Sequence, residues 1–183
     1  QELENELILY LTNDNPLSNN FNGAYTAIDP GIPKETPDGD PLSDSDRSYA
    51  FEGYQIYQLS DETIGPADLN DIEKARLIFQ CDVANDIDVV VNYVQDTEME
   101  LSVPTLMANG DNEGVSHSFQ VTKDAFAQGD NALINHKTYY FMALAYGYNN
   151  YQDYDPVTLA GQDLQYKASR KAAVGSIRVY SGT

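Results

Sequence analysis

The chain has 183 residues, of which 42% are hydrophobic, and its 29 acidic residues against 10 basic ones give a formal net charge of −19. This charge repels the phosphates of nucleic acids and of anionic membranes, so electrostatics exclude both as partners. It suits a soluble protein or one that collects divalent cations. The single cysteine, Cys81, lies in an apolar run and cannot form an intrachain disulfide. No apolar run reaches the roughly 18 residues of a transmembrane helix.

The chain begins with a strand pattern and continues into an irregular stretch. Residues 2–11, ELENELILYL, alternate in a way that predicts a strand, although a short helix also fits. Residues 12–48 contain five prolines and many Asn, Asp and Gly residues. These residue types remove ladder donors and favour turns, which predicts a long acidic insertion without regular strands. Phe21, Tyr25 and Ile28 are expected to attach part of it to the core.

The middle of the chain reads as a series of short strands. Residues 49–59, YAFEGYQIYQL, predict a strand in which Gly53 marks a twist or bulge. One short helix is predicted to start at residues 65–68, and a single helical turn at 123–128. Four further strands are predicted, at 76–83, 88–94, 98–106 and 115–121. Pro104 places the third of these at a sheet edge.

The most strongly patterned stretch is LINHKTYYFMALAYGY, residues 133–148. It predicts a turn followed by a long strand, because its aromatic enrichment favours strand over helix. Both faces of this strand are apolar or aromatic, so it is expected in the middle of a sheet with cover on both sides. Residues 175–181 predict a last strand with Ile177 and Val179 facing inward. Short strands, frequent turns and little helix together predict a β-sandwich.

Two of these stretches together resemble the fibronectin type III fold. Residues 51–59, FEGYQIYQL, match the third strand of such domains. Leu133 lies six residues before Tyr139, the spacing of the family's tyrosine corner, in which the tyrosine hydroxyl bonds the backbone of the preceding turn. The resemblance implies a fibronectin type III/immunoglobulin-like antiparallel β-sandwich, to which residues 12–48 and the strands between 76 and 106 are additions.

More specifically, the chain is similar to fibronectin-like modules of large secreted and cell-surface proteins of Bacteroidota that use the type IX secretion route. The segments that carry this similarity are NDNPLSNNFN, FEGYQIYQL, EKARLIFQCD, GVSHSFQVTKDAF and YYFMALAYGYNNYQDYDP. The resemblance implies a secreted or cell-surface location and contacts with neighbouring domains or subunits of a surface assembly. We expect residues 1–183 to form a single elaborated domain, excised from a longer chain.

Residues suited to catalysis are few. The chain has only two histidines, His117 and His136. Ser116 and Ser118 flank His117, but neighbouring strand residues point to opposite faces, so their adjacency predicts no Ser–His pair. With 29 acidic residues, some carboxylate pair always lies within reach, and such a pair therefore carries no signal. The sequence predicts a non-enzymatic protein.

The acidic insertion contains a candidate calcium site. Asp38, Asp40, Asp44 and Asp46 fall within nine residues and offer hard oxygen ligands. The string lacks the register and the terminal Glu of an EF-hand, and a solvated acidic loop is the alternative interpretation. Two weaker candidates are formed by Asp111, Asn112 and Glu113 and by Asn149, Asp153 and Asp155.

A group of tyrosines follows the central strand. Tyr148, Tyr151 and Tyr154 lie beside Asn and Asp residues, as in a stacking platform for sugar rings. They favour an alternative function, a carbohydrate-binding module attached to a secreted hydrolase, with polysaccharide as its partner. The competing interpretation is that these rings cover one end of the sandwich.

Overall fold

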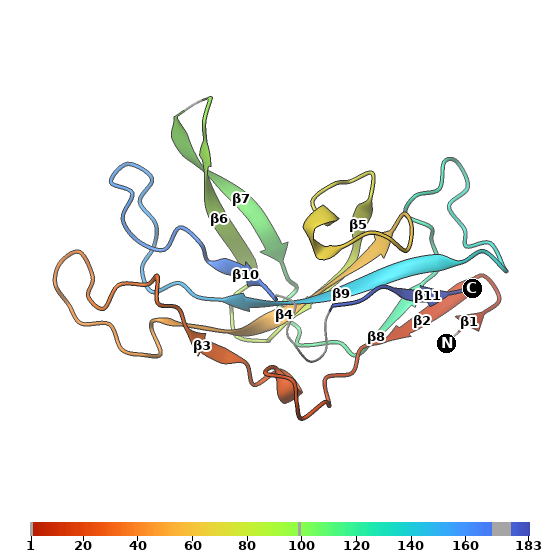
Figure 1. The fold of residues 1–183 in the computed structure, drawn as a ribbon, viewed down its shortest axis with the longest axis horizontal. Helices are drawn as coiled ribbons and strands as arrows, with labels where there is room; N and C mark the ends of the chain where they lie inside the picture. Colours follow the sequence, from red (N-terminus) through yellow and green to blue (C-terminus); the bar gives the residue numbers. More distant parts are fainter. Residues whose placement is uncertain (1, 99, 170–176) are drawn as a thin grey trace.

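The computed structural model describes residues 2–98, 100–169 and 177–183, and Figure 1 shows their arrangement. These residues form antiparallel strands and two 3-10 turns, without any α-helix among them. The mostly β, antiparallel character predicted from the sequence is confirmed. None of the helical turns in the described ranges has the length or apolar character of a membrane-spanning segment.

The central sheet is built on two long strands, β4 (Ser48–Leu59) and β9 (Tyr139–Tyr148). They pair antiparallel from Ala50 opposite Tyr148 to Leu59 opposite Tyr140. The other strands of this sheet are β3 (Thr26–Ile28), β5 (Ala75–Asp82), β10 (Tyr166–Ala168) and β11 (Tyr180–Gly182).

Each of the two long strands is paired on both sides. β3 and β5 pair with β4, while β10 and β11 pair with opposite ends of β9. No residue of β9 is exposed, because its two faces are both covered. The predictions that this strand is central and that a strand occupies residues 49–59 are therefore confirmed. β11 begins later than the predicted last strand, and residues 175 and 176 lie outside the described residues.

A second sheet covers one face of the central sheet. It contains β1 (Glu2–Leu3), β2 (Glu6–Tyr10) and β8 (Ser118–Val121), in the order β1-β2-β8. The core between the two sheets is made of buried side chains from both layers, including Leu7, Val121, Tyr54, Ile56, Tyr139 and Phe141. Two antiparallel layers around a shared apolar interior are consistent with the predicted β-sandwich.

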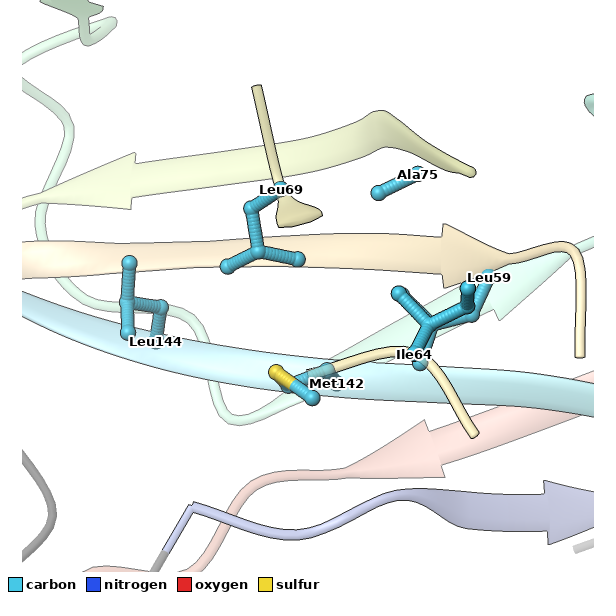
Figure 2. Close-up of a cluster of buried hydrophobic side chains, with 6 residues drawn as sticks. All are labelled: Leu59, Ile64, Leu69, Ala75, Met142 and Leu144. Carbon is cyan, nitrogen blue, oxygen red and sulfur yellow. The ribbon is translucent and has the colours of Figure 1, made fainter. Parts of the chain in front are cut away.

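The opposite face of the central sheet is covered by a connection and by a hairpin. Ile64 and Leu69 from the β4–β5 connection pack on Leu59, Met142 and Leu144 (Figure 2). Each of these buried side chains contributes on the order of 2 kcal/mol to folding. Further along this face lies the β6–β7 hairpin, formed by β6 (Val89–Asp96) and β7 (Leu101–Asn109), which projects from the sheet in Figure 1.

A buried glutamine joins the β6–β7 hairpin to the central sheet. Gln55 is 2% exposed, and its amide group donates to the carbonyl of Met107 in β7 at 2.8 Å and to Gln80 Oε1 at 3.1 Å. Its amide oxygen accepts hydrogen bonds from the hydroxyls of Tyr166, at 2.8 Å, and Tyr57, at 3.2 Å. Hydrogen bonding of this kind is what permits a polar side chain at such a depth.

The predicted bulge at Gly53 is confirmed. The register of β4 against β9 shifts between Phe51 and Gly53, so Glu52 is an extra residue without a partner in β9. A β-carbon at position 53 would fall 2.2 Å from the carbonyl oxygen of Cys81, which explains the glycine. The prediction that Pro104 lies in an edge strand also holds, because among the described residues β7 pairs with β6 alone.

The insertion differs from its prediction in two respects. It contains one short strand, β3, which pairs with the start of β4. Phe21 and Ile28 do not attach it to the core, since they are 38% and 48% exposed. The buried apolar side chain of the insertion is Ile32, at 5% exposure. Strand alternation alone could not identify it, because Ile32 lies in a loop.

Neither predicted helical segment forms an α-helix. At the first segment, a 3-10 turn forms at Pro66–Asp68, and two further turns follow it. In these turns the amide of Asp71 donates to the carbonyl of Asp68, and the amide of Lys74 donates to the carbonyl of Asp71. These bonds span three residues instead of four, so no α-helix develops. The segment 123–128 contains one turn, in which the amide of Ala127 donates to the carbonyl of Asp124 at 3.2 Å, and Lys123 at its start bridges Ala132.

Candidate functional site

The four aspartates of the predicted calcium loop are all exposed and do not converge. Asp46 accepts hydrogen bonds from the hydroxyl and amide of Ser43 at 2.6 and 2.8 Å, which lower its pKa. Asp44 contacts Arg47 at 3.5 Å, and the amide of Asp40 binds the hydroxyl of Thr36. Across the described ranges, no three His, Cys, Asp or Glu side chains gather as metal ligands. The structure therefore places Asp38, Asp40, Asp44 and Asp46 in turns of the insertion.

The three candidate sugar-binding tyrosines are partly buried and hold their own loop in place. Tyr154 stacks on Tyr93 of β6, with ring centroids 4.4 Å apart, and its hydroxyl bonds Ser102 of β7 at 3.2 Å. The hydroxyl of Tyr151 donates to the carbonyl of Gly161 at 3.2 Å. Burial raises the pKa of Tyr148. These contacts fit the interpretation in which the rings cover one end of the sandwich.

The two histidines stand in separate loops. A ring nitrogen of His117 lies 3.2 Å from the carbonyl oxygen of Leu11, and His136 occupies a turn with φ of 67°. Cys81 is buried, with its sulfur 3.8 Å from the carbonyl of Ser116, and burial raises the pKa of its thiol. Thiol reactivity requires a lowered pKa, and Cys81 instead packs with Tyr54 and Phe119 in the buried core.

A pair of buried carboxylates lies where β4 and β5 meet. Glu52 is 3% exposed and Asp82 is 2% exposed. One oxygen of Glu52 accepts a hydrogen bond from the side-chain amide of Asn85 at 2.9 Å, and one oxygen of Asp82 accepts from the backbone amide of Asn112 at 2.9 Å. The remaining oxygens, Glu52 Oε1 and Asp82 Oδ2, have no hydrogen-bond partner among the described residues.

The surroundings of Glu52 and Asp82 disfavour ionisation of both carboxyl groups at once. Burial, and then repulsion from Asp82, raise the pKa of Glu52 to about 7 despite the hydrogen bond from Asn85. Burial also raises the pKa of Asp82, and the charges of Asp111 and Asp88 add to it. Ionised carboxylates of this depth are normally paired with a cation or bound to a metal.

Two loops at the base of the β6–β7 hairpin enclose the carboxylate pair. Gly110 follows β7, and a β-carbon there would lie 1.8 Å from Asp82 Oδ2. The backbone amides of Asn85 and Asp86 donate hydrogen bonds to the side-chain oxygen of Asn112, at 2.7 and 3.1 Å, and these bonds connect the two loops. The loop that contains Gly110 and Asn112 therefore has a specific place over Asp82.

Sequence reasoning missed Glu52 and Asp82. Both were assigned to strands, where a charged residue is normally taken to face solvent. A detectable signal was present in the acidic residue directly before the bulge glycine, because a bulge turns neighbouring side chains toward one side. The weaker candidate formed by Asp111, Asn112 and Glu113 includes Asn112, which bonds Asp82, but neither of the two buried carboxylates.

The β6–β7 hairpin exposes apolar side chains. Those about half or more exposed are Val89 (49%), Val94 (51%), Leu101 (60%) and Leu106 (60%). β6 is anchored to the segment before β10, since the amide of Tyr93 bonds the carbonyl of Asp163 at 2.7 Å. β7 forms the outer margin of the hairpin, so its exposed leucines are available for contact with another molecule.

A groove of about 570 Å³ opens between β2 and the central sheet. Its lining includes Leu11, Tyr54, Ile56 and Ala143, which continue the apolar core to the surface. Tyr10 and Tyr180 stand at this groove and are 63% and 56% exposed.

Comparison with protein family models, with curated proteins and with solved structures finds no match to this chain. The geometry alone therefore defines a class: a mostly β protein of antiparallel layers, with a projecting apolar hairpin and a buried carboxylate pair at its base.

Proposed function

We propose that this chain is a non-enzymatic structural and interaction module of a secreted bacterial cell-surface protein. The sandwich acts as a scaffold, and the β6–β7 hairpin contacts neighbouring domains or subunits. The observation that carries this proposal is the exposure of Leu101 and Leu106, both 60%, on a hairpin that projects from a protein of net charge −19. Exposed apolar side chains grouped on one element are typical of protein contact surfaces.

The finer assignment to a fibronectin type III/immunoglobulin-like sandwich belongs to the same proposal. It is supported by the turn before β9, where the backbone amide of Ile134 donates to the hydroxyl of Tyr139 at 2.8 Å. Leu133, in the same turn, is 4% exposed and packs with Tyr139 in the core. The secreted, cell-surface location follows from the resemblance to modules of Bacteroidota surface proteins.

The proposal is tested in intact cells that make the protein. A photo-crosslinking amino acid placed at position 106 is expected to give a discrete crosslinked product, because this side chain faces a partner. The same group at position 72 is the matched control, since Ile72 is 71% exposed but lies in the β4–β5 connection. Leu101 lies five residues away in the same strand and points to the opposite face of the hairpin, so Leu101→Ser should leave the product formed from position 106 in place.

The location is tested on the same cells with a membrane-impermeant biotinylation reagent. Labelling of the protein in intact cells is expected. Protection from the reagent until the cells are lysed would contradict the surface location. Equal crosslinking from positions 106 and 72 would contradict the role of the hairpin.

A further inference from the structure

We propose that Glu52 and Asp82 form a binding site for a hard divalent cation at the base of the β6–β7 hairpin. This inference does not depend on the proposed function, because it rests on the carboxylate pair and on the loops that enclose it. The chemistry is that of Ca²⁺ or Mg²⁺, both of which bind carboxylate, carbonyl and amide oxygens. The experiments below distinguish the two ions.

The first argument is the pair of unpartnered oxygens. Glu52 Oε1 and Asp82 Oδ2 have no donor among the described residues, although the two side chains are only 3% and 2% exposed. The other oxygen of each carboxylate is already fixed, by Asn85 and Asn112 respectively. Each side chain is thus held in place with one lone-pair-bearing atom unused, as a metal ligand requires. Buried polar atoms without a partner are rare in folded proteins.

The second argument is charge. None of the ion pairs found in the described parts of the chain includes Glu52 or Asp82. Asp88 and Asp111 bring further negative charge to Asp82. A bound dication would neutralise the buried pair, and no basic side chain is described in that position. Two carboxylates buried together are otherwise strongly unfavourable.

The third argument is the construction of the loops. The absence of a β-carbon at Gly110 lets the backbone approach the carboxylate of Asp82, since a β-carbon would lie 1.8 Å from Oδ2. Asn112 fixes the loop at 85–86 through two backbone amides. The two loops and the bulge at Glu52 therefore meet at one place. Backbone carbonyls, amide oxygens and water would complete the coordination around the two carboxylates.

The chemistry of the donors selects the class of ion. Both free atoms are carboxylate oxygens, which suit Ca²⁺ and Mg²⁺ and not the softer metals that prefer nitrogen or sulfur. The neighbouring Cys81 packs with Tyr54 and Phe119 in the core between the two sheets. Tyr146 reports on the site, because burial and the charges of Asp82 and Glu52 raise the pKa of its phenol.

The main experiment measures thermal unfolding of the full 183-residue chain. After treatment with chelator, the protein is unfolded in EDTA, in CaCl₂ or in MgCl₂. At a cation concentration about a hundredfold above Kd, the melting temperature should rise by roughly 5–10 °C. The ion that gives this shift at the lower concentration is the preferred ligand. An unchanged melting temperature with both ions would overturn the proposal.

Three variants locate the site. Glu52→Gln and Asp82→Asn should each abolish the shift, because they remove the charge but keep the shape of the side chain. The matched control is the double variant Asp38→Asn with Asp40→Asn, which removes two exposed acids and should keep the full shift. A shift that persists in both Glu52→Gln and Asp82→Asn would place the cation elsewhere and overturn the proposal.

A second measurement guards against variants that fail to fold. Terbium replaces calcium at oxygen sites, and its luminescence is excited through nearby tyrosine, so it should titrate with the wild-type chain and be displaced by Ca²⁺. Tyr146→Phe, which leaves both carboxylates in place, should lower the emission without changing the melting-temperature shift. Two results together would contradict the proposal: neither cation changes the melting temperature of the wild type, and Glu52→Gln is more stable than the wild type in EDTA. They would show that protonation, and not a bound cation, relieves the repulsion between the two carboxylates.

Discussion

The backbone amide of Ile134 donates a hydrogen bond to the hydroxyl of Tyr139 over 2.8 Å. The ring of Tyr139 is 3% exposed, so its hydroxyl fixes the turn to the first residue of the central strand. We predict that Tyr139→Phe lowers the free energy of unfolding by about 1 kcal/mol, because the amide loses its acceptor. Urea unfolding followed by circular dichroism measures the change.

Tyr140→Phe is the control for this substitution. Tyr140 is the next residue of β9 and is only partly buried, and the loss of its hydroxyl should change the free energy of unfolding by less than about 0.5 kcal/mol. Equal losses in the two variants would show that the Ile134–Tyr139 bond adds nothing specific.

Asp124 gives the fold a dependence on pH. It is 4% exposed, and its carboxylate accepts hydrogen bonds from Lys137 at 2.6 Å, Gln58 at 2.7 Å and the amide of Phe126 at 2.9 Å. Burial raises the pKa of Asp124, but these hydrogen bonds outweigh burial and hold the pKa below its usual value. Its contribution to stability is therefore complete above the unfolded-state pKa and is lost as pH falls through the folded-state value.

We predict that Asp124→Asn lowers the free energy of unfolding by roughly 2–4 kcal/mol near neutral pH. The difference from wild type should shrink as pH falls below about 4, where the unfolded chain binds the proton first. Urea unfolding at a series of pH values measures it, with the exposed Asp38→Asn as a control. A difference that stays constant into the acid range would rule out this linkage.

Gly110 is predicted to be intolerant of a side chain. Its backbone amide bonds the carbonyl of Asp88 at 2.7 Å, and an added β-carbon would meet the carboxylate of Asp82. Gly110→Ala should cost about 2–3 kcal/mol of unfolding free energy through overpacking. Gly65→Ala is the control, because a β-carbon at position 65 would lie 3.7 Å from its nearest neighbour, a carboxylate oxygen of Asp68. This substitution should change the free energy of unfolding by less than about 0.5 kcal/mol. Similar values for both would contradict the close approach.

Tyr154 is predicted to act in packing. Tyr154→Ala removes the stack on Tyr93 and the bond to Ser102, and should lower the free energy of unfolding by about 2–3 kcal/mol. In affinity electrophoresis through gels that contain polysaccharides, we expect no retardation of wild type. Retardation of wild type that is lost in Tyr151→Ala and Tyr154→Ala, but kept in Tyr180→Ala, would instead support the carbohydrate-binding module.

Local patterns were sufficient to predict the long strands and their irregularities. The aromatic run of β9, the bulge at Gly53 and the edge position of Pro104 each follow from properties of a few consecutive residues. Such features could be predicted because alternation, proline and glycine act through the local backbone. The hydroxyl bond in the turn before β9 was instead implied by the resemblance of the Leu133–Tyr139 segment to a tyrosine corner.

Contacts between distant segments could not be predicted in this way. Glu52 and Asp82 lie in different strands, and nothing in either local pattern shows that they meet. The two interpretations of Tyr154, sugar platform or cover of the sandwich, stayed open because its partner, Tyr93, lies in β6, far from it in the sequence. The sequence also did not show that Leu69 packs on the central sheet, because a leucine can be buried equally well from a helix and from a loop.

Gln55 has a further consequence for the β6–β7 hairpin. Apolar contacts have no preferred direction, whereas the side-chain amide of Gln55 is satisfied by the carbonyl of Met107 and the hydroxyl of Tyr166 in one alignment alone. Gln55 therefore fixes the alignment of the β6–β7 hairpin on the central sheet. It fixes the angle at which the hairpin leaves the central sheet, and with it the positions of Leu101 and Leu106 on the two faces of the hairpin.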